Sequence, residues 1–88
     1  MKDNNLEEKK KSVDIIVNGR MVETFEKKLS YSEIIIIAFG SYEQSDALAY
    51  TVTYSKGQPN NDEGRLLPGK EVTVKKGMVF NATKTTRS

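Results

Sequence analysis

Alternating apolar and polar residues mark the start of the folded part of the chain. Four of the five residues at positions 13–17 (VDIIV) are β-branched, and a second β-rich run follows at 20–25 (RMVETF), with Asn18 and Gly19 between the two. Asn-Gly is the strongest short hairpin signal, because both residues tolerate the positive φ angles of a two-residue turn. The pattern therefore predicts a domain that opens with a β-hairpin.

Capping residues predict a helix over residues 31–39, although the four consecutive isoleucines in this segment favour a strand by propensity alone. Ser30 and Glu33 have the spacing of a capping box, in which each side chain bonds the main-chain amide of the other residue. Gly40 suits the C-terminal stop. Isoleucines facing several directions indicate a short helix lying against a curved sheet, with most of its circumference covered.

Three further strands are expected after the helix. Residues 50–55 (YTVTYS) alternate apolar and hydroxyl side chains, turn residues fill positions 56–64, and two closing strands are predicted at 71–74 and 78–83. The order of hairpin, helix and strands predicts an α+β fold of the β-grasp type, a mixed four- to five-stranded sheet with one helix packed across one face. The right-handed crossover rule places a later strand parallel to the first.

Polar segments are expected to border this domain on both sides. Residues 1–11 contain a single apolar side chain after the initial Met and predict a disordered lead, with a short helix or a docking arm as the alternatives. Residues 84–88 (KTTRS) lack a core residue and predict a flexible C-terminal tail. Residues 12–83 are then the folded domain.

Composition excludes several classes of function. The chain of 88 residues has room for one domain, and it contains neither Cys nor His. The usual thiol nucleophiles, imidazole bases and transition-metal ligands are therefore missing, so we expect no catalytic residues, no metal site and no cofactor. A small enzyme built on Asp, Glu, Ser or Tyr stays the least favoured alternative.

Charge and hydropathy also narrow the range of partners. Lys and Arg number 14 against 12 Asp and Glu, with both signs mixed along the chain, so we expect no nucleic-acid partner. The longest apolar run, residues 34–39, is far short of the roughly 20 residues that span a membrane. The polar N-terminus does not resemble a signal peptide. We therefore expect a cytoplasmic protein with no membrane association.

One sheet face is a candidate for a partner-binding patch. Alternation along the first strand places Asp14 and Ile16 on the face opposite the core residues. An exposed Ile16 beside Val79 of the last strand would form an apolar patch for a partner protein. The alternative is a scatter of single surface apolar residues, which is common on soluble domains.

Several strings together resemble the bacterial multiubiquitin family over residues 13–83. They are IVNGR (16–20), LSYSE (29–33), AFG (38–40), YTVTY (50–54), LPGKEVTV (67–74) and GMVFN (77–81). The resemblance implies a ubiquitin-like fold and a place in bacterial conjugation pathways, some of which are linked to defence against phage. The partners it implies are an activating enzyme, a conjugating enzyme, a deconjugating peptidase and target proteins.

The resemblance also implies where the chemistry would occur. A modifier of this class reacts through its C-terminal carboxylate, so the expected conjugation tail consists of Lys84, Thr85, Thr86, Arg87 and Ser88. Ubiquitin and its nearest relatives end in Gly-Gly, whereas this chain ends in Arg87-Ser88. The difference leaves three alternatives: a different activating channel, trimming before activation, or no conjugation. In the last case the protein would be a non-covalent adaptor or regulator.

Overall fold

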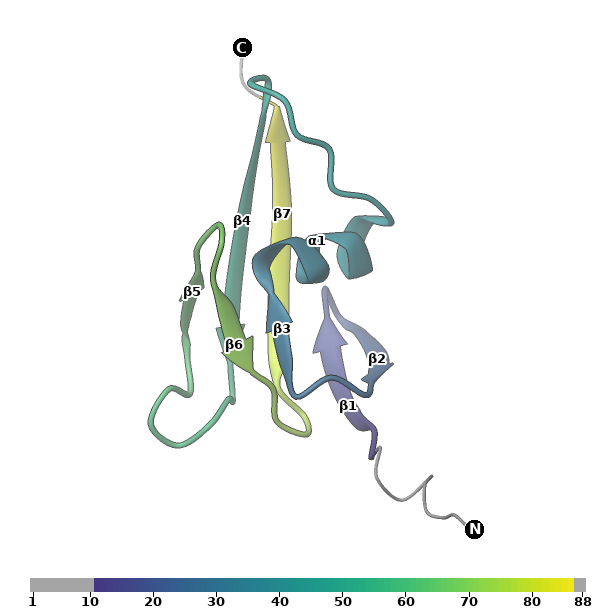
Figure 1. Cartoon of the computed structure of the whole chain (residues 1–88), viewed down its shortest axis with the longest axis vertical. Helices are drawn as coiled ribbons and strands as arrows, with labels where there is room; N and C mark the ends of the chain where they lie inside the picture. Colours follow the sequence, from purple (N-terminus) through teal and green to yellow (C-terminus); the bar gives the residue numbers. More distant parts are fainter. Residues whose placement is uncertain (1–10, 87–88) are drawn as a thin grey trace, which may run out of the picture.

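A computed structural model describes residues 11–86. The elements along this part of the chain are β1 (Val13–Val17), β2 (Arg20–Thr24), β3 (Lys28–Ser30), α1 (Tyr31–Phe39), β4 (Leu48–Ser55), β5 (Gly64–Leu66), β6 (Glu71–Thr73) and β7 (Val79–Thr86). Five strands form one sheet in the order β2-β1-β7-β4-β5, and β3 and β6 form a separate two-stranded sheet. β1 and β7 are parallel, and the other neighbours are antiparallel. The predicted α+β β-grasp, with one helix across one face of a mixed sheet, is confirmed (Figure 1).

Local hydrogen bonds explain why α1 begins and ends where it does. The Ser30 hydroxyl accepts from the Glu33 amide at 3.2 Å, and the Glu33 carboxylate accepts from the Ser30 amide at 2.8 Å. Gly40 has a left-handed φ of 87°, and its amide donates to the Ile36 carbonyl at 2.7 Å. The predicted helix over residues 31–39 and its capping box are therefore confirmed.

The isoleucines of α1 divide between core and solvent. Ile34 and Ile35 are fully buried, while Ile36 is 48% exposed. The expectation that most of the helix circumference is covered is wrong on the Ile36 side. Glu33, three residues before Ile36, is also exposed, so these two residues mark the solvent side of the helix.

The core lies between the large sheet and the layer formed by α1 and the β3–β6 pair. Its buried apolar side chains come from every strand except β2: Ile15, Val17, Leu29, Tyr31, Ile34, Ile35, Val52, Tyr54, Leu66, Val72, Val74, Met78, Phe80 and Ala82. The large sheet therefore has one covered face and one open face.

A side chain extends the pairing of β1 with β7. Asn18 and Gly19 have φ angles of 51° and 80°, as the predicted hairpin turn requires. The Asn18 main-chain amide still donates to the Phe80 carbonyl of β7 at 3.0 Å, and beyond it the main chain turns away and the Asn18 side-chain amide continues the pairing. Its Oδ1 accepts from the Ala82 amide at 2.8 Å, and its Nδ2 donates to the Ala82 carbonyl at 3.1 Å.

Some strand boundaries differ from the sequence-based expectation. β3 and β5 were not predicted, and β4 begins at Leu48 rather than residue 50. The strand predicted at 71–74 exists as β6, but it pairs with β3 instead of joining the large sheet. These short strands depend on distant partners, which local periodicity does not reveal.

The expected flexible tail is wrong for its first three residues. Lys84, Thr85 and Thr86 belong to β7 and pair with Tyr50, Ala49 and Leu48 of β4, so the folded part extends beyond residue 83. Pairing supplied by β4 compensates for the absence of core residues here. Arg87, Ser88 and the predicted lead at residues 1–10 lie outside the described residues.

Replacing Asn18 should measure the contribution of its two bonds to Ala82. Asn18→Gly keeps the positive φ but removes both bonds, so we expect the free energy of unfolding to fall by about 1–2 kcal/mol. Asn18→Asp should cost at least as much at neutral pH, because a carboxylate oxygen then faces the Ala82 carbonyl. Urea denaturation measures both losses. Asn60→Gly in an exposed turn is the control, and an equal loss there would contradict the role of Asn18.

Candidate interaction surfaces

The open face of the large sheet carries one row of apolar side chains. Ile16 of β1 lies opposite Met21 of β2 and opposite Val79 of β7. Residues paired across strands project from the same face, so the three side chains are neighbours. Ile16 and Val79 are half-buried, and Met21 is 71% exposed. We call Met21, Ile16 and Val79 the apolar row.

The predicted neighbours Ile16 and Val79 are therefore side by side, and their role in partner binding stays a prediction. Sequence reasoning missed Met21. The hairpin register could have identified it, because a two-residue turn at Asn18-Gly19 fixes Ile16 opposite Met21.

Polar side chains surround the apolar row on the same face. On one side lies the opposed pair of exposed acids Asp14 and Glu23. On the other side the β4–β7 ladder presents the pairs Thr53↔Asn81 and Thr51↔Thr83. The open face thus has a short apolar row between a negative edge and a hydroxyl-rich area.

The C-terminal part of β7 forms the second candidate surface. Lys84 lies with its ammonium 3.6 Å from a Glu43 carboxylate oxygen and 5.4 Å from the centre of the Phe39 ring. Thr85 and Thr86 are exposed. Of the predicted tail residues, the structure brings Lys84, Thr85 and Thr86 together on one strand that leads to the tip of the molecule (Figure 1).

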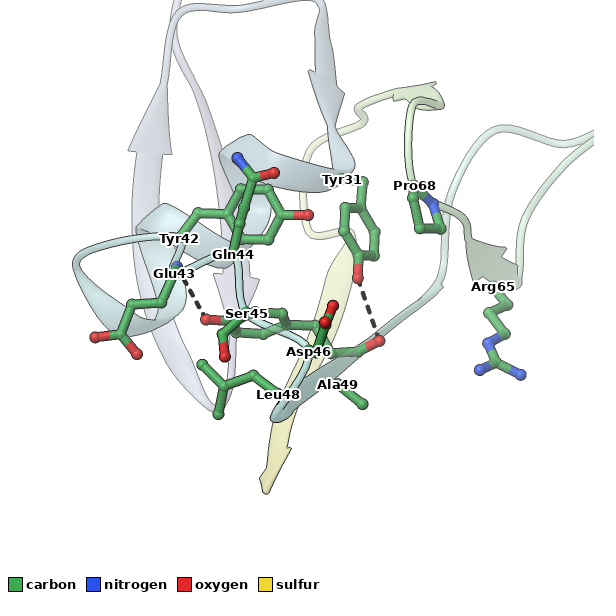
Figure 2. A pocket seen from close by; sticks show the side chains of 11 residues that line it. Tyr31, Tyr42, Glu43, Gln44, Ser45, Asp46, Leu48, Ala49, Arg65 and Pro68 are labelled. Atoms are coloured by element: carbon green, nitrogen blue, oxygen red, sulfur yellow. Dashed lines mark hydrogen bonds between the residues drawn. The ribbon is translucent and has the colours of Figure 1, made fainter. Parts of the chain in front are cut away.

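A hollow of about 720 Å³ lies beside β4 and was not foreseen from the sequence. It is lined by Tyr31, Tyr42, Glu43, Gln44, Ser45, Asp46, Leu48, Ala49, Tyr50, Arg65 and Pro68 (Figure 2). We call it the tyrosine hollow. The Tyr42 ring meets those of Tyr31 and Tyr50 edge-on, at centroid distances of 5.9 and 5.3 Å. Such edge-to-face contacts hold the α1–β4 link against β4.

Hydrogen bonds fix two of these tyrosines. The Tyr31 hydroxyl donates to the Tyr50 carbonyl at 3.3 Å, and the Tyr50 hydroxyl accepts from the Glu43 amide at 3.1 Å (Figure 2). Burial raises the pKa of Tyr31 above its ordinary value of 10.0, neighbouring Tyr42 and Tyr50 add to this, and the positive charge of Arg65 opposes it. The Tyr31 hydroxyl therefore remains a neutral donor well into alkaline solution.

The described residues show no arrangement suited to metal chemistry. Nowhere in residues 11–86 do three or more acidic side chains gather as a metal site requires, and the sequence has no Cys or His. No helix in the same residues is long and apolar enough to cross a membrane. What the geometry offers is a set of surfaces: the apolar row, the β7 end and the tyrosine hollow.

The sheet order, the single helix on one face and the parallel β1–β7 pair define a β-grasp domain of the ubiquitin-like class. The sequence profile described as multiubiquitin matches residues 13–86, and the chain belongs to this family. The resemblance found in the sequence is thereby confirmed. No curated protein and no solved structure matches the chain.

The Tyr31 environment predicts how stability changes in alkali. Well below pH 10.0, the ordinary pKa, the hydroxyl is neutral in both the folded and the unfolded chain, and its stabilising contribution is complete. Above this pH the unfolded chain ionises first, so the free energy of unfolding should decline as pH rises through the higher pKa of the folded state. Urea denaturation at increasing pH measures the decline. The decline should be shallower for Tyr31→Phe, and an unchanged slope would contradict the assignment of this decline to Tyr31.

Proposed function

We propose that this ubiquitin-like protein is a modifier that is activated at its C-terminus and conjugated to target proteins. We place it in the cytoplasm of a bacterium, in a ubiquitination-like pathway with defence against phage as its biological setting. The main support is membership of the multiubiquitin family, whose profile extends through β7 to residue 86. The position of Lys84, Thr85 and Thr86 at the tip, away from the core, also supports it.

The proposed chemistry needs no catalytic group on this chain. In an activating enzyme the C-terminal carboxylate would attack the α-phosphate of ATP, which forms an acyl adenylate and releases pyrophosphate. A nucleophile of the activating or conjugating enzyme would then displace AMP, and a target amine would finally displace that nucleophile. The reacting carboxylate would belong to Ser88 or to an upstream residue exposed by a deconjugating peptidase.

The apolar row offers these enzymes a place to bind. Side chains that are apolar, exposed and clustered are the usual anchors of protein interfaces. Met21 projects furthest, Ile16 and Val79 form the base beside it, and the acids Asp14 and Glu23 border them. A partner with apolar side chains flanked by basic residues would complement this surface.

A second candidate function is a non-covalent adaptor that binds partner proteins without conjugation. The pairing of Lys84, Thr85 and Thr86 with β4 favours it, because a tail that threads into an activating enzyme must be extended and free.

The two functions predict different products. Incubation with a cognate activating enzyme, ATP and magnesium should add a second protein to the C-terminal peptide, as intact-mass and peptide mass spectrometry will show. Deleting residues 84–88 removes the whole proposed conjugation tail and should abolish the adduct. If no adduct forms, and a complex of the protein with the activating enzyme survives deletion of residues 84–88, the adaptor function is correct. An adduct on an internal lysine would contradict both.

Variants of the apolar row should weaken partner binding without unfolding the domain. Met21→Glu places a charge at the most exposed position of the apolar row, so we expect about tenfold or greater loss of affinity for the activating enzyme. The free energy of unfolding should change by about 0.5 kcal/mol or less, because the side chain is exposed. Thr53→Glu on the hydroxyl-rich part of the same face is the matched control. Equal losses from both variants would contradict a role specific to the row.

A further inference from the structure

One edge of β4 lacks a neighbouring strand over half its length within the described residues. β7 pairs with the whole of Leu48–Ser55, whereas β5 pairs on the other edge with residues 52–54 only. The edge facing β5 therefore has no strand beside residues 48–51, about 13 Å of extended chain at ~3.3 Å per residue, and at its far end the Leu48 amide already donates to the Ser45 carbonyl at 3.1 Å. An open edge of this kind is a template for another extended chain.

The main-chain groups of Tyr50 show which bonds remain available along this edge. Opposed pairs in an antiparallel ladder alternate between hydrogen-bonded and non-hydrogen-bonded. The Tyr50 carbonyl accepts from the Tyr31 hydroxyl, so Tyr50 and Lys84 form a non-hydrogen-bonded pair, and the Tyr50 amide also points away from β7. At 3.3 Å the hydroxyl contact is long for an O–H···O bond. Within residues 11–86, Tyr50 therefore presents a main-chain donor without a partner and a weakly occupied acceptor.

The tyrosine hollow provides different side chains on the two sides of this open edge. The rings of Tyr31 and Tyr42 lie on the helix side. Arg65 pairs with Thr53, and the Thr53 side chain projects from the open face of the sheet. The Arg65 side chain therefore lies on the side opposite the two rings, and Figure 2 shows it well apart from Tyr42. Successive side chains of an added strand would point alternately toward the rings and toward Arg65.

We propose that residues 48–51 are a docking site for an extended peptide segment of a partner protein, bound as an additional strand beside β4. The segment carries an aromatic or aliphatic residue that contacts the Tyr31 ring and Pro68, and an Asp or Glu at the next position that pairs with Arg65. This site is separate from the apolar row and does not depend on conjugation.

Charge and volume both support this peptide chemistry. Arg65 is exposed, and its positive charge is close enough to act on the Tyr31 hydroxyl. Glu43 is engaged by Lys84 at 3.6 Å, while Asp46 lines the loop side of the hollow and disfavours an acidic residue there. The acid of the peptide is thus directed to Arg65. The volume of about 720 Å³ falls within the usual range of roughly 300–1,000 Å³ for binding pockets.

The test titrates acetyl-Thr-Phe-Asp-Phe-Asp-Phe-Thr-amide into the isotope-labelled full chain and follows amide shifts by NMR. We expect the largest changes at residues 48–51, with a dissociation constant of about 0.1–1 mM for so short a peptide. Methylating the amide nitrogens of its three central residues should abolish binding, because strand addition uses main-chain bonds. Equal binding of the methylated peptide, shifts confined to another surface, or no shift at several-fold higher concentration would overturn the proposal.

Three variants of the protein and a charge exchange in the peptide make the test specific. Arg65→Glu should weaken binding about tenfold, and a peptide with Lys in place of Asp should regain it. Lys76→Glu, at an exposed turn away from the hollow, should bind as the unmodified chain does. Tyr31→Phe frees the Tyr50 carbonyl and should tighten binding about twofold. Concentration-dependent shifts at residues 48–51 without peptide would show that a second copy occupies the edge, and would also overturn the proposal.

Discussion

The antiparallel pairing of β4 with β7 is the interaction on which the rest of the structure depends. It joins eight residue pairs, from Leu48↔Thr86 to Ser55↔Val79, and forms the centre of the sheet. β1 attaches to the other edge of β7, and β5 to the other edge of β4. Because side chains alternate between faces, this register places Val52, Phe80 and Ala82 against the helix and leaves hydroxyl side chains in solvent. A slip of one residue would exchange the two faces, so the register and the core determine each other.

The same pairing explains why the molecule has two unlike ends. Where β1 and β5 lie alongside, apolar side chains cover the inner face of the ladder. Toward the tip the inner positions are Leu48, Tyr50, Lys84 and Thr86, and no neighbouring strand covers them. Here an aromatic cluster replaces the core: Tyr50 contacts Tyr42 and Phe39, and Lys84 lies over the Phe39 ring. The tyrosine hollow and the end of β7 are therefore consequences of a central ladder that is longer than the sheet around it.

Sequence patterns predicted the elements that are determined by residues close together in the sequence. Asn18-Gly19 and the Ser30–Glu33 capping box carry their own geometry within a few residues, so the hairpin and the helix follow from them. The neighbours Ile16 and Val79 followed from alternation combined with the parallel crossover. The three-residue strands β3 and β5 could not be predicted in this way, because only the pairing with their partners β6 and β4 makes these segments strands. For the same reason KTTRS suggested a free tail: its threonines and lysine gain order from β4, and no apolar residue in the segment indicates this.

The central ladder also links the two surfaces near the tip. Leu48, Ala49 and Tyr50 hold the last residues of β7 on one edge and line the tyrosine hollow on the other. Freeing Lys84, Thr85 and Thr86 for an enzyme costs the main-chain bonds of this stretch, each worth about 0.5–1.5 kcal/mol. A strand docked on the open edge of β4 would hold residues 48–51 extended and so increase that cost. Because coupling between two sites is reciprocal, an enzyme that withdraws the end of β7 would weaken docking to the same degree. Peptide docking and use of the C-terminal segment would then oppose each other through β4, with no contact between the two partners.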